Sequence, residues 1–490
     1  MLDTLFLILL CSLFVMSSCT ISSKKRSERI SFKTDDVPVV ILTETSSPLK
    51  TSEQFAKVLQ EASSSQKFKV LFDFREQLDL VNFKTRLNGL GLSKSARRDE
   101  VIKALNILSD RKEKEIRPIV ESLMERGEIE YFKKFSIVNR FYAVASASAI
   151  RALAAREDIA RVIEEYHSAS ERAGSQYENI KEIEALQGDI TENWALKIMG
   201  AEKVWAMGFD GSGVVVGSLD TGVWLHHEQL RKNFRGGDKS WFDPVTGTSE
   251  PFDSKGHGTG VLSCASGRNE NRKKIGVAPG STWVAALANH KNFYNNIHMT
   301  CCADWMLNVA KPDVIVNAWS HSRSKCKDFD LDFINAWKAA EIFPVFAAGN
   351  QGPSHSSSES PADLPSTFPG GVPAFSVGSV NAGKEVSSFS SRGPSRCSGE
   401  IFPMVVAPGE DVFFAFPIQS NSYMTYSGTS AASGYAAGAV AILIQKYPEM
   451  SVEDLERLLK NHAVDLGSPG PDNESGFGLI YLPDLIRSQW

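Results

Sequence analysis

The sequence predicts an α/β protein with a mostly parallel central sheet, preceded by a small α+β domain. From Ala195 onward, short continuous apolar runs alternate with Gly-rich turns and helical segments. Continuous runs of this kind are typical of parallel strands that are covered on both faces. Upstream, strand-like and helix-like segments alternate over about a hundred residues, which indicates a separate unit with its own core.

Length and composition limit the classes of protein to consider. A chain of 490 residues exceeds one small domain, and its apolar fraction of 42% supports a globular core. The net charge of −5 is small for this size and argues against a nucleic-acid partner. Two of the seven cysteines lie in an N-terminal apolar segment, so the other five form at most two disulfides. A pair of Cys326 with Cys301 or Cys302 is one option.

Residues 1–19 predict an export signal. The apolar run 5–16 is too short for a comfortable membrane span and fits the core of a signal peptide. Small residues precede Cys19, as at a lipoprotein cleavage site. A lipid on Cys19, a simple signal peptide and an uncleaved anchor remain alternatives. Each of them places the protein outside the cytoplasm, as a secreted, periplasmic or membrane-anchored chain.

Three segments follow before the main domain. Residues 20–66 are rich in Ser, Thr, Lys and Glu without a sustained apolar period, and we expect a disordered tether. The α+β domain occupies residues 67–167, and a polar, acidic linker occupies residues 168–193. The expected elements of the α+β domain are strand 67–74, helix 93–126, strand 135–144, helix 147–155 and strand 160–166.

The main domain, residues 194–490, contains six apolar runs that we expect to be strands. In a parallel sheet, functional groups gather at the carboxyl ends of the strands. The runs are 214–219, 283–287, 314–317, 344–348, 375–380 and 404–407.

A small-residue segment that begins Gly428-Thr429-Ser430 supplies the first candidate group. Its Ala, Gly and Ser composition predicts a buried helix with its first turn at Ser430. There, unpaired backbone N–H groups at the positive helix end would stabilise an oxyanion formed when the hydroxyl attacks a carbonyl. Taken alone, an N-cap role is the more common use of such a serine.

Three more polar residues stand at the ends of apolar elements. Asp220 ends the first run of the main domain, where a turn-initiating role is the alternative. His257 lies between Gly256 and Gly258, which let backbone and ligand approach the imidazole. Asn350 follows another run, and its amide could donate to an oxyanion, although a turn residue is the simpler interpretation.

Together these four residues meet the needs of acyl transfer. Ser430 would be the nucleophile, and His257 would take its proton and deliver it to the leaving amine. Asp220 would hold the imidazole, while Asn350 and the Ser430 N–H would bind the oxyanion.

The order of these groups and of the surrounding motifs resembles one known family. The motifs are Asp220-Thr221-Gly222, His257-Gly258-Thr259, Gly276-Val277-Ala278-Pro279-Gly280, Ala347-Ala348-Gly349-Asn350, Phe389-Ser390-Ser391-Arg392-Gly393-Pro394, Ala407-Pro408-Gly409, Gly428-Thr429-Ser430 and Gly476-Phe477-Gly478-Leu479-Ile480. The chain resembles the subtilisin-like serine proteases (subtilases, peptidase family S8), and among them the bacillopeptidase F type. The order Asp, His, Ser is that of subtilisin.

The resemblance implies a three-layer subtilisin-like fold behind a ferredoxin-like prodomain. It also implies that this prodomain is a chaperone and intramolecular inhibitor, removed by self-cleavage. The substrates would be polypeptides. The expected partners include no nucleic acid, and a membrane only through a lipid anchor.

The resemblance also assigns the substrate-binding edges, and one of them departs from the family pattern. One edge is Ala318-Trp319-Ser320, where the family usually has Ser-Trp-Gly or Ser-Leu-Gly, and the other includes Ala348 and Gly349. Because Ser320 adds atoms where a substrate backbone approaches closely, we predict a narrower or shifted primary pocket.

Other departures concern metal content and the helices beside the site. Gln229 stands where the family has a calcium-ligating Asp, and an uncharged ligand binds calcium more weakly. No cofactor is expected to be required and no metal ligand is assigned, although calcium remains open. Gly260 replaces a usual His, and Gly434 replaces a usual Pro.

The sequence therefore predicts an exported serine endopeptidase that is made as a self-processing zymogen. An alternative is a weak or inactive scaffold protein of the same fold, in which Ser320, Gly260 and Gly434 block turnover. An esterase or peptide ligase acting through the same site is a third option.

Overall fold

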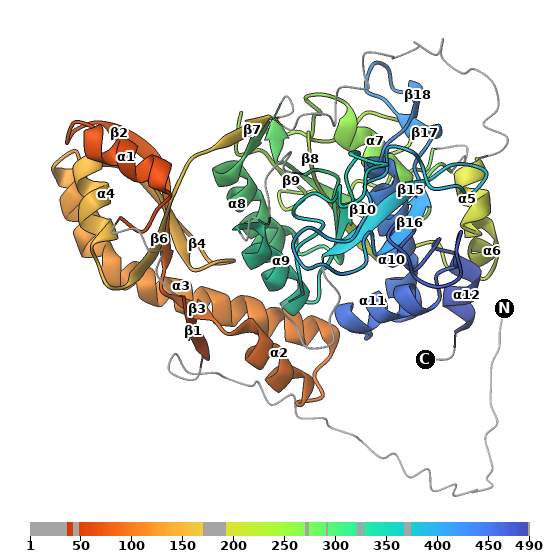
Figure 1. Cartoon of the computed structure of the whole chain (residues 1–490), viewed down its shortest axis with the longest axis horizontal. Coiled ribbons are helices and arrows are strands. Elements are labelled where there is room, and N and C mark those ends of the chain that lie inside the picture. The colour runs from red at the N-terminus through yellow and green to blue at the C-terminus, as the bar shows by residue number, and fades with distance from the viewer. Residues whose placement is uncertain are drawn as a thin grey trace, which may run out of the picture.

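The computed structural model describes residues 37–42, 49–169, 193–269, 274–290, 293–320, 326, 329–366 and 374–488. They form a smaller N-terminal domain and a larger domain (Figure 1). The predicted signal segment 1–19 with Cys19, and residues 170–192 of the predicted linker, lie outside the described residues.

A seven-stranded sheet forms the centre of the larger domain. Its order is β16-β15-β14-β13-β8-β10-β9, and every pairing is parallel. The six predicted runs are confirmed as strands, each within one residue at either end. The bounds are β8 Val215–Asp220, β9 Trp241–Phe242, β10 Thr282–Leu287, β13 Val314–Asn317, β14 Phe343–Ala347, β15 Phe375–Val380 and β16 Val405–Pro408.

Helices cover both faces of this sheet, which gives three layers. Alternate residues of β13 show this, because Val314 and Val316 join the apolar core that contains α7 and α10, whereas Ile315 joins the core that contains α8 and α9. The helices are α5 Trp194–Ile198, α6 Ala201–Ala206, α7 His257–Ser266, α8 Asn296–Trp305, α9 Phe329–Ala339, α10 Thr429–Lys446, α11 Val452–Asn461 and α12 Leu482–Arg487, with a π-helical turn at Met306–Ala310.

Two small sheets flank the large one. The hairpin of β17, Val412–Ala415, and β18, Tyr423–Tyr426, packs beside α7. A second sheet has the order β11-β12-β7, in which β7 comes from the end of the N-terminal domain. Its strands are β11 Asn289–His290, β12 Phe293–Asn295 and β7 His167–Ala169.

The N-terminal domain has the ferredoxin-like arrangement that the sequence resemblance implies. The elements β2, α3, β4, β5, α4 and β6 occur in this order, with β3 and α2 inserted between β2 and α3, and the antiparallel sheet order is β4-β5-β2-β6. The bounds are β1 Val39–Ile41, α1 Glu53–Glu61, β2 Lys67–Phe74, β3 Glu76–Leu78, α2 Leu80–Asn88, α3 Lys94–Glu125, β4 Ile129–Phe135, β5 Arg140–Ser146, α4 Ala147–Ala154 and β6 Ile159–Glu164.

Two expectations for this domain were wrong. The predicted tether 20–66 contains β1 and α1, and the Ser52 side chain caps α1 while Phe55 and Leu59 enter the core. The predicted strand 135–144 is instead the end of β4, a turn and the start of β5. Helix α1 is short, so it shows little of the apolar period that marks a helix. The turn within 135–144 contains no Gly or Pro to mark it.

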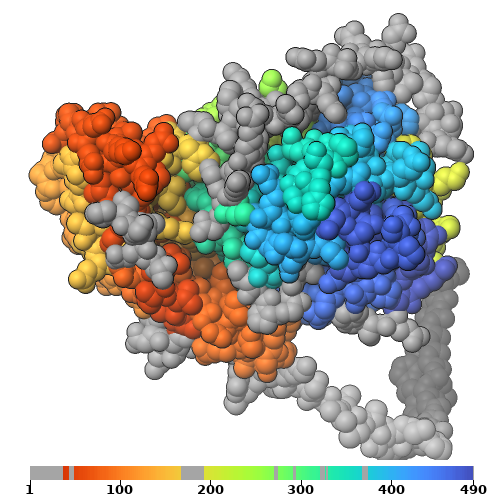
Figure 2. Space-filling model, viewed as in Figure 1, coloured from red at the N-terminus to blue at the C-terminus, as the bar shows by residue number. Residues whose placement is uncertain are grey.

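The two domains share an apolar core. One buried cluster contains Phe83, Leu87 and Val101 of the N-terminal domain together with Phe333 and Trp337 of α9. Figure 2 shows the N-terminal domain, coloured red to yellow, packed against one side of the larger domain. The N-terminal domain therefore covers surface that the larger domain would otherwise expose.

The larger domain contains a disulfide. Cys326 pairs with Cys397, whereas Cys301 and Cys302 are free and buried, so the suggested pairing of Cys326 with either of them was wrong. Within the described ranges, no helix combines the length and apolar character needed to cross a bilayer.

Candidate active site

A buried aspartate and histidine meet at the carboxyl edge of the sheet. Asp220 is the last residue of β8, and His257 is the first residue of α7. The Nδ1 atom of His257 lies 2.7 Å from Oδ1 of Asp220, and both residues are 2% exposed. A carboxylate this deeply buried is stable only when it is paired, and the imidazole supplies the pair.

Local sequence brings these two residues together. A Cβ atom on Gly258 would overlap with the carbonyl oxygen of Gly222, so glycine lets α7 approach the end of β8. The Thr221 hydroxyl accepts a hydrogen bond from the Gly258 N–H and donates one to Asp253. The motifs that begin at Asp220 and His257 are thus joined directly.

Asp253 is a positioning residue that the sequence analysis missed. Its carboxylate accepts hydrogen bonds from the backbone N–H groups of Lys255, Gly256 and Thr259 and from the Thr259 hydroxyl. It therefore fixes the first turn of α7, and with it the His257 ring. An Asp four residues before His257 was the available signal, because Asp often bonds the backbone that follows it.

Ser430 lies in the first turn of α10, as predicted. The helix begins at Thr429, and its residues through Ile444 are buried. Small residues allow this burial, since a Cβ atom on Gly434 would overlap with the carbonyl oxygen of Val261 in α7. The Ser430 side chain therefore stands at the positive end of a helix held against α7.

Ser430 and His257 both lie beside Tyr426. The Tyr426 and His257 rings are 6.1 Å apart. Burial raises the pKa of Tyr426, and a hydrogen bond with the Ser430 side chain opposes this rise. The Ser430 hydroxyl donates to the carbonyl oxygen of Ala318 at 3.5 Å, and His257 Nε2 is buried without a hydrogen-bond partner. A rotation about χ1 of Ser430 redirects its hydroxyl.

Asn350 is fixed beside Ser430 through Thr429. The Oδ1 atom of Asn350 accepts hydrogen bonds from the Thr429 N–H at 2.9 Å and from the Thr429 hydroxyl at 3.0 Å. The Thr429 hydroxyl in turn accepts the Gly349 N–H. Because the amide oxygen is committed, the NH₂ group of Asn350 remains as a donor to a ligand.

The electrostatics of the pair favour the charged imidazole. Burial alone would lower the pKa of His257, but the charge and hydrogen bond of Asp220 raise it above its ordinary value of 6.5. A protonated His257 is therefore stabilised where it would form after accepting a proton.

The two predicted substrate-binding edges share one carboxylate. The Ser320 hydroxyl donates to Oε2 of Glu359 at 2.7 Å. A Cβ atom on Gly349, which has a φ of 102°, would lie 2.9 Å from the same oxygen. Ala318 and Ala348 are buried behind these edges. Glu359 was not predicted from the sequence, because it lies in a polar loop outside both edge motifs.

Aromatic side chains connect these edges with β12. The Trp319 ring lies 5.7 Å from that of Tyr294 in β12. Strand β7 of the N-terminal domain pairs antiparallel with β12, with Ser168 opposite Tyr294. Just before β7, the Tyr166 ring stacks on Tyr294 at 5.7 Å.

The structure accounts for two of the departures from the family pattern. A Cβ atom on Gly260 would overlap with the ring of Phe414, so this ring fills the space where the family has a histidine side chain. The side-chain NH₂ of Gln229 donates to the Tyr423 hydroxyl at 2.9 Å. In the parts of the chain that are described, no cluster of three or more His, Cys, Asp or Glu forms a metal site.

Comparisons with known proteins show which family the chain resembles. The model of the Subtilase family matches residues 211–478. Bacillopeptidase F of Bacillus subtilis (strain 168) is 27% identical over 89% of this chain and 34% of its own length. The chain thus spans about a third of that relative. Subtilisin DY of Bacillus licheniformis is 30% identical over 56% of this chain and 93% of its own length. Subtilisin Savinase of Lederbergia lenta is 28% identical over 60% of this chain and 98% of its own length. Because the family model covers more than half of the 490 residues, the chain belongs to the subtilase family.

Proposed function

We propose that the protein is an exported serine endopeptidase whose N-terminal domain is an inhibitory prodomain. The observation that carries the enzymatic part is the buried Asp220–His257 pair, whose free Nε2 atom lies in the same site as Ser430. Family membership supports the same activity.

The four candidate residues can carry out every step of acyl transfer. His257 Nε2 takes the proton of the Ser430 hydroxyl as Oγ bonds to the scissile carbonyl carbon. The carbonyl oxygen becomes an oxyanion that accepts hydrogen bonds from the Asn350 NH₂ and the Ser430 N–H. His257 then gives its proton to the leaving amine, the C–N bond breaks, and water releases the acyl group by the same steps. Asp220 keeps the imidazole oriented and stabilises its charge.

The substrate would bind as an added strand. Strand β12 and the segment Ala318–Ser320 flank the path toward Ser430, and β7 occupies the β12 side of it as an antiparallel strand. Backbone pairing gives affinity for extended peptides of many sequences, and side-chain pockets add selectivity. A polypeptide substrate fits this arrangement.

The same pairing supports the zymogen proposal. While β7 is seated on β12, no substrate strand can form those hydrogen bonds. Tyr166 reinforces the contact, since its N–H donates to the Asn296 side chain at 3.1 Å and its ring packs on Tyr294 and Phe329. Cutting the chain after β7 would let this segment separate from β12.

Processing tests both parts of the proposal. The wild-type chain is expected to be shortened near the linker that follows Tyr166, and the Ser430→Ala variant is expected to stay at full length. Intact mass and N-terminal sequencing identify the product. Identical trimming of the variant would assign maturation to another protease.

A second candidate is a scaffold of the same fold with little or no turnover. The observation that favours it is the Ser430 hydroxyl, which bonds to Ala318 O and not to His257. Hydrolysis of a peptide library by processed protein separates the two. The enzyme is expected to cut peptides in wild type and not in Ser430→Ala, whereas a scaffold cuts none in either form.

Export is the remaining part of the proposal. The apolar segment 5–16 supports it, and so does the Cys326–Cys397 disulfide, because such bonds persist mainly in oxidising compartments. Whether Cys19 carries a lipid is decided by the mass of the N-terminal peptide. Calcium content is decided by metal analysis of the processed protein.

A further inference from the structure

A buried carboxylate lies between the two edges that would hold a substrate beside Ser430. Glu359 is 6% exposed, and its Oε2 atom accepts the Ser320 hydroxyl at 2.7 Å. The same oxygen lies 2.9 Å from the place that a Cβ atom on Gly349 would take. Ser320 ends one edge and Gly349 belongs to the other. Glu359 therefore places a carboxylate in the space that both edges border.

These edges would receive the residue on the acyl side of the scissile bond. The carbonyl oxygen of Ala318 lies 3.5 Å from Oγ of Ser430. Gly349 directly precedes Asn350, which is the proposed donor to the oxyanion. A residue that presents its carbonyl to both groups would lie between the two edges. Its side chain is the one that would enter the space where Glu359 lies.

Glycine at position 349 leaves room for the carboxylate. Gly349 has a φ of 102°, and a Cβ atom there would lie 2.9 Å from both Oε2 of Glu359 and Oγ of Ser391. The Ser391 N–H donates to the Gly349 carbonyl at 3.0 Å, and the Ser391 hydroxyl accepts the Gln351 N–H at 3.1 Å. The backbone of this edge is thus fixed beside the acid.

Hydrogen bonds hold the loop on both sides of Glu359. The Ser358 and Ser360 hydroxyls donate to the two carboxylate oxygens of Asp363, at 2.9 and 2.8 Å. The Ser357 hydroxyl accepts a backbone N–H at 2.8 Å. Because its neighbours are fixed, Glu359 is positioned before any ligand arrives. A charge that is already in place binds its partner with little further loss of conformational freedom.

The disulfide connects this loop with the edge that ends at Ser320. Cys326 follows Ser320 by six residues and is bonded to Cys397. The Sγ atom of Cys397 lies 3.8 Å from the hydroxyl of Ser360, which directly follows Glu359. The chain that continues from one edge is therefore joined covalently to a residue beside the carboxylate loop.

We propose that Glu359 selects a lysine or arginine side chain on the acyl side of the scissile bond. The cation would donate hydrogen bonds to the carboxylate, and a guanidinium can bond both of its oxygens at once. Exclusion of water strengthens the attraction between the two charges. The inference rests on the proposed peptidase function and names its substrate class, which is polypeptides with a basic residue before the cut.

Ser320 is a positioning residue in this proposal. The resemblance places a glycine at its position in the family, and glycine has no side-chain donor. Here the Ser320 hydroxyl bonds to Oε2 of Glu359 and so orients the carboxylate. The departure from the family pattern and the buried acid are therefore two parts of one pocket.

The chain itself contains two substrates of this class. Strand β7 ends at Ala169, and residues 170–193 include two basic residues, Arg172 and Lys181. We expect self-processing to cut after Arg172 or Lys181, and N-terminal sequencing of the matured protein identifies the junction. A self-processing junction after an apolar residue would contradict the proposal.

Peptides that differ at one position test the proposal on wild-type protein. They carry Lys, Arg or Met before the cut, and Met is an unbranched side chain without charge. We expect kcat/KM of the matured protein for the Lys and Arg peptides to exceed that for the Met peptide by about tenfold to a hundredfold. Equal or faster cleavage of the Met peptide would overturn the proposal for Glu359 alone. Cleavage of no peptide, or equal cleavage by Ser430→Ala, would overturn the proposed function as well.

Three variants connect the preference with the carboxylate. Glu359→Gln keeps the shape of the side chain without its charge and is expected to bring the ratio of the Lys and Met values close to one. Glu359→Asp keeps the charge and is expected to retain a preference for the basic peptides. Glu400→Gln, at an exposed position of the same domain, is the matched control and should keep the wild-type ratio.

The comparison does not depend on how well each variant matures. A recognition sequence for a site-specific protease, inserted between residues 180 and 181, lets every form be cut in the same way. Since each protein is compared with itself on two peptides, the ratio is independent of the fraction of active enzyme. A folded Glu359→Gln protein with the ratio of the Glu400→Gln control would show that the carboxylate only joins the two edges, and this would overturn the proposal.

Discussion

The hydrogen bond between Asp220 and His257 determines how the proposed base titrates. Asp220 raises the pKa of the imidazole above 6.5, and only the neutral imidazole can accept the Ser430 proton. Activity should therefore increase with pH through a midpoint above 6.5. The same pKa shift has the opposite effect on the stability of the fold as pH rises. The pair stabilises the fold fully below the unfolded pKa, and this stabilisation is lost as pH rises through the folded value.

Replacing Asp220 by Asn tests this coupling. We expect kcat to fall by about 10⁴-fold, because the imidazole loses its orientation and the carboxylate that stabilises its charge. The midpoint of the pH profile of kcat/KM should also move to lower pH. A pH series with a peptide substrate measures both quantities. An unchanged midpoint in Asp220→Asn would show that Asp220 does not set the pKa of the base.

Ser320 is the residue at which the pocket departs from the family pattern. Its hydroxyl donates to Glu359, and the same carboxylate lies against Gly349 of the other edge. We expect Ser320→Gly to widen the range of accepted residues on the acyl side of the cut. Cleavage profiles of a peptide library compare this variant with Ser249→Gly, a change at an exposed position. If the profile of Ser320→Gly matches that of wild type, the hydroxyl does not shape the pocket.

At the scale of elements, close packing of α7 with α10 and with the β17–β18 hairpin holds the site together. Gly260 faces Phe414 on β17, and Gly434 faces the backbone of α7. The absence of bulk at these positions lets three elements meet behind His257. The two glycines therefore allow a packing arrangement that differs from the family pattern, and the Asp220–His257 contact is kept.

The variant Gly260→Ala tests how tightly α7 packs against β17. The added methyl group overlaps with the Phe414 ring, and overpacking of this kind costs about 1–3 kcal/mol. We expect a lower free energy of unfolding for Gly260→Ala in a Ser430→Ala background, measured by urea denaturation. Adding Phe414→Leu should recover part of the loss. Equal stability of Gly260→Ala and its parent would mean that Phe414 moves aside without cost.

At the scale of the whole molecule, the sheet of the larger domain could be predicted because its strands are continuous apolar runs between Gly-rich turns. The candidate site could be predicted because the motifs sit at the ends of those runs. The turn between β4 and β5 could not. Its residues Ile137 and Val138 are apolar but pack against the other domain, and Asp304 accepts the Ser136 and Ile137 N–H groups.

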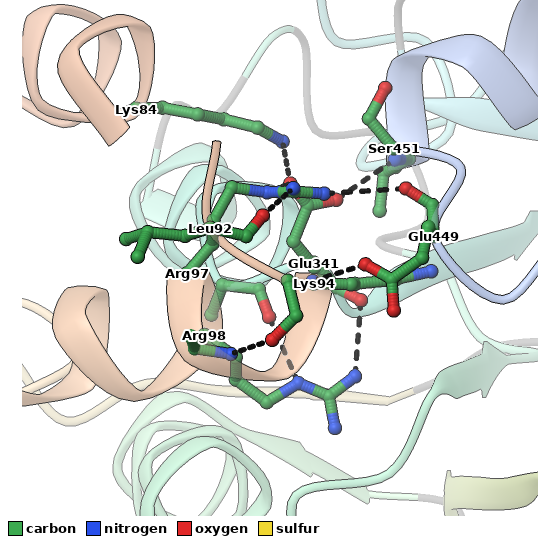
Figure 3. Close-up of polar contacts among 12 residues, drawn as sticks. Lys84, Leu92, Lys94, Arg97, Arg98, Glu341, Glu449 and Ser451 are labelled. Carbon is green, nitrogen blue, oxygen red and sulfur yellow. Dashed lines mark hydrogen bonds and ion pairs between the residues drawn. The ribbon is translucent and has the colours of Figure 1, made fainter. Parts of the chain in front are cut away.

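Other features were also set by contacts between distant segments. Asp253 and Glu359 act through loops whose positions no local pattern reveals. The same is true of the contact between the two domains, where Arg97 and Arg98 of α3 bond to Glu341 after α9 (Figure 3) although the sequence shows them only as charges on a helix. Periodicity predicts which face of an element is apolar, but it does not predict which distant carboxylate a surface cation will meet.

The central claim is that Ser430 is a nucleophile activated by His257. Treatment of the processed protein with a fluorophosphonate probe, followed by intact mass and peptide mapping, tests this claim most directly. We predict one adduct on Ser430, slowed strongly in Asp220→Asn and absent in Ser430→Ala. Processed wild-type protein that takes up no probe at pH 8, or takes it up equally in Ser430→Ala, would contradict the claim.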